Sequence, residues 1–134
     1  MTVRRFFWIF ISLGVLFVLP GCSSSANNAE TSAVLAYADP ATQTTLQGLS
    51  EDNLAKYTQF ADAQFKAAVT QELLDKVSSQ INSQIGTFVS AALLSTETQG
   101  QYVIVHYSAK YSNSTVKVRM VFDQDHLVAG QFFE

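Results

Sequence analysis

We build the predicted fold around TQELLDKVSSQINSQIG, residues 70–86. Its apolar residues recur at steps of three and four, the spacing of one face of an amphipathic helix, and polar residues fill the other face. Thr70 suits the N-cap, Glu72 suits the positive end of the helix dipole, and Gly86 is a typical stop. We therefore predict one helix that covers the following sheet with Leu73, Leu74, Val77, Ile81 and Ile85.

After this helix the apolar period changes from 3.6 to 2, which indicates strands. Short polar turns separate four such segments, which cover residues 88–94, 102–111, 116–122 and 127–133. The alternation assigns faces within the two central strands. One face of the predicted sheet then carries Val103, Val105, Tyr107, Ala109 and Tyr111 from the second strand, and Val116, Val118, Met120 and Phe122 from the third.

Before residue 70 the chain shows two further helix signals. Asp39-Pro40 combines a capping residue with proline at the first helical position, and predicts a helix to about Leu49. A second short helix follows Ser50. Helices followed by four strands on short turns predict an α+β fold, with N-terminal helices packed on a four-stranded antiparallel meander.

Composition narrows the class of protein. The chain has 134 residues, enough for one domain, and a formal charge of −3. Nucleic acid is not expected as a partner, because phosphate binding needs clustered Lys and Arg. The single cysteine, Cys22, excludes an internal disulfide.

The first residues have the layout of a secretory signal. Arg4 and Arg5 form a positive start, and Phe6 to Leu19 form an apolar segment of 14 residues. As a helix this segment rises about 21 Å, which is short of the roughly 30 Å hydrocarbon core of a bilayer. The sequence therefore favours a signal segment, residues 1–21, over a membrane span.

Leu19-Pro20-Gly21-Cys22 resembles the lipobox of prokaryotic lipoprotein signal peptides, although Pro20 replaces the usual small residue. The resemblance implies cleavage between Gly21 and Cys22, and acyl chains such as palmitate on Cys22. Several acyl chains would hold the protein on a cell membrane or envelope, facing outside the cytoplasm. A plain secretory signal and an uncleaved anchor are the alternatives. Cleavage would leave six basic against eleven acidic residues, a charge of −5.

Residues 22–38 are small and polar without a sustained period, and predict a flexible tether between the lipidated cysteine and a single domain at residues 39–134. The order of elements, LQGLSEDN at 46–53, Ile85-Gly86-Thr87-Phe88 and the tail VFDQDHLVAGQFF at 121–133 resemble a small domain-of-unknown-function family. Its members occur as lipoproteins and in front of α/β-hydrolase domains. The resemblance implies a cystatin-like, nuclear-transport-factor-2-like fold, in which a curved sheet wraps a long helix.

The last turn departs from that family. Where the family tends to have Asp-Gly, this chain has Asp125-His126. Histidine tolerates a positive φ less well than glycine, so the sequence predicts strain or another turn type here. Asp123, Asp125 and His126 are also metal-ligand types, but Asp-rich turns form through local backbone hydrogen bonds, and we expect neither a metal nor a cofactor.

Candidate site residues lie on the predicted strands. His106 shares a face with Tyr102 and Lys110, while Tyr107 points to the opposite face. Lys110, Lys117 and Arg119 could gather into a basic patch or form an ordinary solvated face. The candidates for a pocket or an interface are therefore Tyr102, His106, Tyr107, Lys110 and Arg119.

Three functions remain open from the sequence. The first is a membrane-anchored, non-catalytic module that binds an envelope protein or a small ligand. The second is a structural subunit that forms a homodimer through its exposed sheet face. The third is a pocket enzyme, for which relatives of the cone-shaped fold use Asp, His or Tyr inside the pocket. An outward-facing His106 would exclude the version of the enzyme that uses histidine.

Overall fold

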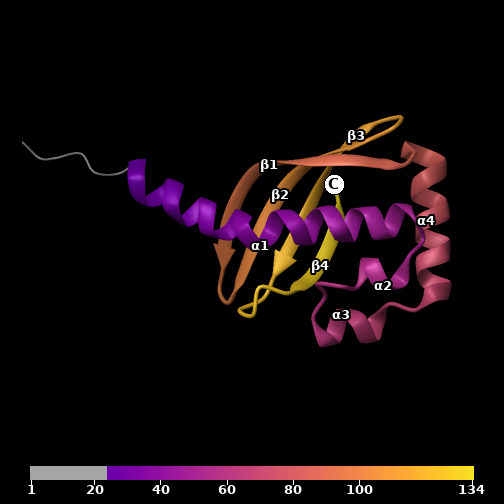
Figure 1. Cartoon of the computed structure of the whole chain (residues 1–134), viewed down its shortest axis with the longest axis horizontal. Coiled ribbons are helices and arrows are strands. Elements are labelled where there is room, and N and C mark those ends of the chain that lie inside the picture. The colour runs from indigo at the N-terminus through magenta and orange to yellow at the C-terminus, as the bar shows by residue number, and fades with distance from the viewer. Residues whose placement is uncertain (1–23) are drawn as a thin grey trace, which may run out of the picture.

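The computed structural model describes residues 24–134 (Figure 1). The predicted signal peptide and the predicted lipidation at Cys22 lie outside these residues. The helices are α1 (Ser24–Ser50), α2 (Leu54–Tyr57), α3 (Ala63–Ala68) and α4 (Gln71–Ile85). The strands are β1 (Phe88–Gln99), β2 (Tyr102–Tyr111), β3 (Thr115–Phe122) and β4 (Val128–Phe133).

The strands form one antiparallel sheet in the order β1-β2-β3-β4, which confirms the predicted meander. The predicted alternation is also confirmed, because Val105, Tyr107 and Ala109 of β2 are fully buried. Opposite them in β3, Val118 and Met120 are buried as well. This inner face of the sheet forms the core.

Helix α1 lies across the inner face of the curved sheet (Figure 1). Ala38, Ala41 and Leu46 belong to the buried cluster, and Val34 and Tyr37 pack against it. The result is the predicted α+β architecture, in the cystatin-like or nuclear-transport-factor-2-like arrangement.

The predicted start of the first helix is wrong. The structure has one helix from Ser24 that passes through Pro40, where the sequence predicts a flexible tether to residue 38 and a helix start at Asp39. Apolar contacts explain the difference, because Val34 to Ala41 must be helical to meet the sheet with one face. Pro40 therefore lies inside the helix with its ring exposed, and the packing of α1 on the sheet has to outweigh the backbone hydrogen bond that proline cannot make.

The helix that covers the sheet is α1, and the prediction that the 70–86 helix does so is wrong. Helix α4 instead packs at the end of α1 (Figure 1). Leu74 and Ser78 are buried there, while Ile81 and Ile85 pack against the core. Leu73, predicted on the buried face, is 46% exposed.

The ends of α4 follow the prediction. The hydroxyl oxygen of Thr70 accepts a hydrogen bond from the amide of Leu73 at 3.2 Å, as an N-cap does. Gly86 follows the last turn with a φ of 87°, which a residue with a side chain would adopt only under strain.

Polar groups join the end of α1 to α4 and β1. The Ser50 hydroxyl accepts a hydrogen bond from the amide of Phe88 at 2.9 Å. The side-chain Nδ2 of Asn82 donates a hydrogen bond to the Ser50 carbonyl at 2.9 Å, and the Ser50 hydroxyl donates one to Asn82 Oδ1 at 3.3 Å. These bonds fix where the sheet begins relative to the helices.

Candidate functional site on the outer face of the sheet

The sheet face turned away from α1, which we call the outer face, carries the polar candidates. It consists of the residues that alternate with the core positions: Tyr102, Ile104, His106, Ser108 and Lys110 of β2, Lys117, Arg119 and Val121 of β3, and Gly130 and Phe132 of β4. Among the predicted candidates, His106 and Arg119 are directly opposite each other in the β2–β3 register.

His106 lies between two carboxylates on this face. Its Nε2 is 3.1 Å from Oε1 of Glu97 in β1, and its Nδ1 is 3.6 Å from Oε2 of Glu134 at the end of the chain. Both carboxylates lie close enough to the ring nitrogens to hold the imidazole in one orientation.

Arg119 lies between Glu134 and an aromatic ring. Its Nε is 3.5 Å from Oε1 of Glu134, which makes the contact an ion pair rather than a close hydrogen bond. Its guanidinium carbon is 4.6 Å from the centre of the Phe132 ring, within the range of a cation–π contact. The outer face therefore has an ordered cluster of Glu97, His106, Arg119, Phe132 and Glu134.

A groove of about 350 Å³ runs beside this cluster, between α3 and the outer face of β3 and β4. We call it the α3 groove. It is large enough for a side chain or a small ligand. Its rim includes two exposed aromatic side chains, Tyr102 at 38% and Phe132 at 47%. The lining residues are Asp62, Gln64, Phe65, Ala68, Tyr102, Val121, Ala129, Gly130 and Phe132.

Tyr107 is not part of this face. It is fully buried on the inner face, and its hydroxyl donates a hydrogen bond to Oδ1 of Asp39 in α1 at 2.8 Å. Burial, followed by this hydrogen bond, raises the pKa of Tyr107 well above its usual value near 10. Because His106 lies outside, the version of the enzyme hypothesis with a pocket histidine is wrong.

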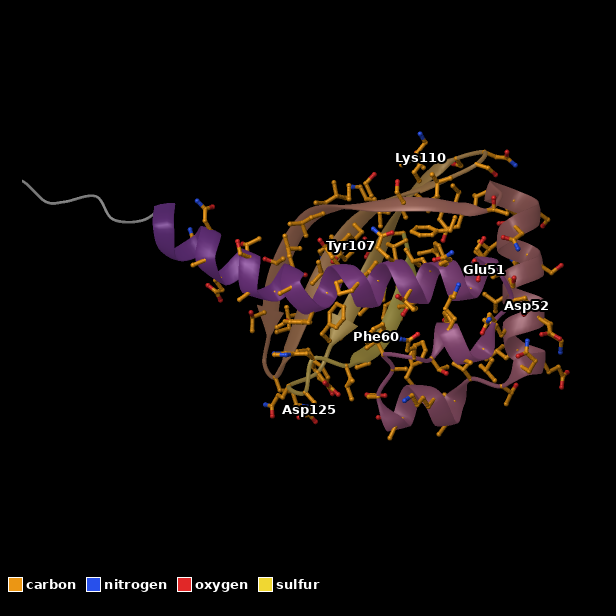
Figure 2. All side chains as sticks on the ribbon, in the orientation of Figure 1. Glu51, Asp52, Phe60, Tyr107, Lys110 and Asp125 are labelled. Carbon is orange, nitrogen blue, oxygen red and sulfur yellow. The ribbon has the colours of Figure 1, made fainter. Side chains whose placement is uncertain are left out.

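Lys110 is exposed at the opposite end of β2 from Tyr102. Figure 2 shows Lys110 at the far end of the strands from the turn that carries Asp125. Lys110 pairs with Thr115, and Lys117 with Ser108, so both lysines lie on the outer face. Of the predicted candidates, His106 and Arg119 thus belong to the cluster and Tyr102 to the rim of the α3 groove. Tyr107 belongs to the core, and Lys110 lies at the basic end of the outer face.

The turn at 123–126 has the predicted local chemistry. Oδ1 of Asp123 accepts hydrogen bonds from the amides of Asp125 and Leu127, each at 2.9 Å. His126 has a φ of 62°, as the departure from Asp-Gly predicts, and its ring stacks on Tyr37 at 4.0 Å. Within residues 24–134 no group of three or more His, Cys, Asp and Glu side chains could hold a metal ion.

Sequence reasoning missed the residues that complete the site. Glu97 and Glu134 reach His106 only through the strand register, and Phe65 reaches the groove only because α3 packs beside β4. One residue in the sequence does indicate the start of α3: Asp62 is a typical N-cap residue. Its Oδ1 accepts a hydrogen bond from the backbone amide of Phe65 at 2.6 Å.

Residues 24–134 thus form a small α+β domain with a hydrophobic core under one face of its sheet and a cluster of polar and aromatic side chains on the other face. The family described as "Protein of unknown function (DUF3887)" matches residues 43–130, and the chain belongs to that family. The match runs from the second half of α1 into β4.

Searches of the curated proteins and of the solved structures give no match to the chain. Of the helices within residues 24–134, none combines the length and the apolar character that crossing a membrane requires.

Proposed function

We propose that the protein is a membrane-anchored extracytoplasmic lipoprotein whose domain binds another molecule without catalysing a reaction. The observation that carries the anchor is the Leu19-Pro20-Gly21-Cys22 motif behind an apolar segment and two arginines. Acyl chains on Cys22 would fix the chain to the outer side of a membrane.

The outer face of the sheet supports the binding role. Phe132 and Tyr102 are exposed next to the α3 groove, and aromatic side chains are enriched in binding surfaces. The neighbouring contacts of Arg119 with Glu134 and of His106 with Glu97 hold that surface in one arrangement.

The anchor is tested by labelling cells that express the chain with an alkyne analogue of palmitate, and by mass spectrometry of the N-terminal peptide. We expect label on the wild-type protein, an N-terminus at an acylated Cys22, and recovery in the membrane fraction. Cys22→Ser should abolish the label and block processing. An unlabelled mature protein in the soluble fraction would refute the anchor.

A structural dimer is the second candidate, and the exposed side chain of Phe132 on the outer face, at 47%, favours it. Native mass spectrometry of the detergent-solubilised chain distinguishes a monomeric binding module from a structural dimer. A dimer that persists on dilution and is lost in Phe132→Ser would replace the binding module with a structural subunit.

A further inference from the structure

We propose that the α3 groove binds an extended segment of a partner protein in which a basic side chain is adjacent to an apolar one. This inference rests on the binding role proposed above and assigns to it a site and a partner chemistry.

The first observation is the apolar character of the groove. Phe65 and Ala68 of α3 form one side, and Val121 and Phe132 of the sheet form the other. Gly130 keeps the groove open, because a Cβ at this position would lie 3.0 Å from the Phe132 ring. Small residues between two aromatic rings leave room for an inserted apolar side chain.

The second observation is the charge at one end of the groove. Asp62 and Tyr102 also line a neighbouring hollow of about 230 Å³, so the two hollows are adjacent. Asp123 and Asp125 line this second hollow. Neither hollow has a Lys, Arg or His among the residues that line it.

These three carboxylates are not neutralised by the protein itself. In the part of the chain that the structure describes, the ion pairs involve Glu51, Glu72, Glu97 and Glu134, and none involves Asp62, Asp123 or Asp125. One oxygen of Asp62 caps α3, and one oxygen of Asp123 closes the turn. Within residues 24–134, neither the second oxygen of Asp62 and Asp123 nor the Asp125 carboxylate has a hydrogen bond or an ion pair of its own.

Charge complementarity selects the occupant. A Lys or Arg side chain places its apolar stem along a hydrophobic wall and its cationic head near carboxylates, which is the order of features along these two hollows. An acidic partner would be repelled by all three aspartates. The nearby Arg119 does not reverse this, because Glu134 and the Phe132 ring engage it on the outer face.

The test uses the full chain reconstituted in lipid nanodiscs and a displayed library of random peptides. Ala68→Arg places a cation in the groove wall, and Ala67→Arg is the matched control, because Ala67 is also exposed on α3 but does not line the groove. Asp125→Asn removes one charge from an exposed turn residue.

We expect the wild-type protein to enrich peptides in which Lys or Arg stands next to an aromatic or aliphatic residue. A selected peptide should bind Ala68→Arg at least about tenfold more weakly, because like charges meet. Asp125→Asn should weaken binding about threefold, as expected for one exposed charge, and added salt should weaken it further. Ala67→Arg should bind like the wild type.

Enrichment of acidic or purely apolar peptides would overturn the inference, and so would equal binding by Ala68→Arg and Ala67→Arg. Self-association that Ala68→Arg abolishes, without peptide enrichment, would assign the groove to a second copy and also refute it. None of these outcomes bears on Cys22, so palmitate labelling and fractionation show separately whether the anchor itself fails.

Discussion

His126 shows at the level of one residue how strain and packing offset each other. Its φ of 62° is unfavourable for a residue with a Cβ, by about 1–2 kcal/mol. Its ring stacks on Tyr37 with planes only 3° apart, and an aromatic pair contributes about 0.5–1.5 kcal/mol. The stack therefore compensates for most of the backbone strain.

We expect His126→Gly to change the free energy of unfolding by less than about 1 kcal/mol, because relief of strain and loss of stacking nearly cancel. In a Tyr37→Leu background there is no ring to lose, and the same change should stabilise the protein by about 1 kcal/mol. Urea denaturation of the wild type, of the two single variants and of the double variant measures the free-energy change of His126→Gly in each background. Equal effects in the two backgrounds would show that the stack contributes nothing.

At the scale of elements, α1 is the part that sequence reasoning described least well. Its first half is rich in Ala, Ser and Asn, and only a few of its side chains, such as Val34 and Tyr37, contact the core. Such a pattern has no visible helical period, and tertiary packing determines its conformation. In contrast, the alternation in β2 and β3 was sufficient to predict the side chains that form the core on the inner face, although Ile104 is buried on the outer face as well.

The continuity of α1 predicts an unusual effect of Pro40→Ala. Inside a helix, proline removes a backbone hydrogen bond and costs up to about 3 kcal/mol, so its replacement should stabilise the protein by about 1–3 kcal/mol. Thermal denaturation measures the change. If the helix instead began at Asp39, Pro40 would be at a favoured first position, and alanine would give no gain.

Ser50→Ala tests the junction of α1, α4 and β1. The change leaves the partly buried amide of Phe88 without its acceptor, so we expect a loss of about 1–3 kcal/mol. Ser79→Ala, at an exposed position of α4, is the control and should change stability by less than about 0.5 kcal/mol. Similar unfolding midpoints for the two variants would contradict the role of the junction.

The position of α3 also could not be predicted from the sequence. Its place beside β4 depends on the parallel bridge between Ala61 and Val128, residues far apart in the chain. The bond from the Asp62 amide to the Val128 carbonyl, at 2.9 Å, fixes the same junction. The α3 groove is a product of this long-range contact, whereas the faces of the strands follow from local alternation.

For the whole molecule, the buried phenols predict a loss of stability at alkaline pH. Burial raises the pKa of Tyr57 to about 12, and it raises the pKa values of Tyr107 and Tyr111 as well. In the unfolded chain a phenol titrates near 10. The folded protein therefore holds these protons more tightly, and the resulting stability is complete below pH 10 and lost as the pH rises through the folded-state values.

We expect the free energy of unfolding to fall steeply between about pH 10 and pH 12. Urea titrations across this range, together with the ultraviolet absorbance of ionised tyrosine, test the link. Tyr107→Phe should be less stable near pH 7, because Asp39 loses a hydrogen bond, and should show a shallower alkaline decline. Ionisation of all the tyrosines near pH 10 in a protein that stays folded would refute the prediction.

The early start of α1 has a mechanical consequence for a lipid-anchored protein. Ser24, the first helical residue, is two residues after Cys22, and residues 24–33 make about 15 Å of helix before Val34 meets the core. If Cys22 is acylated as we propose, the lipid anchor would be followed almost at once by a rigid helix instead of a flexible linker. The distance between the domain and the membrane surface would then vary little, so a partner would have to bind the domain at that distance from the membrane.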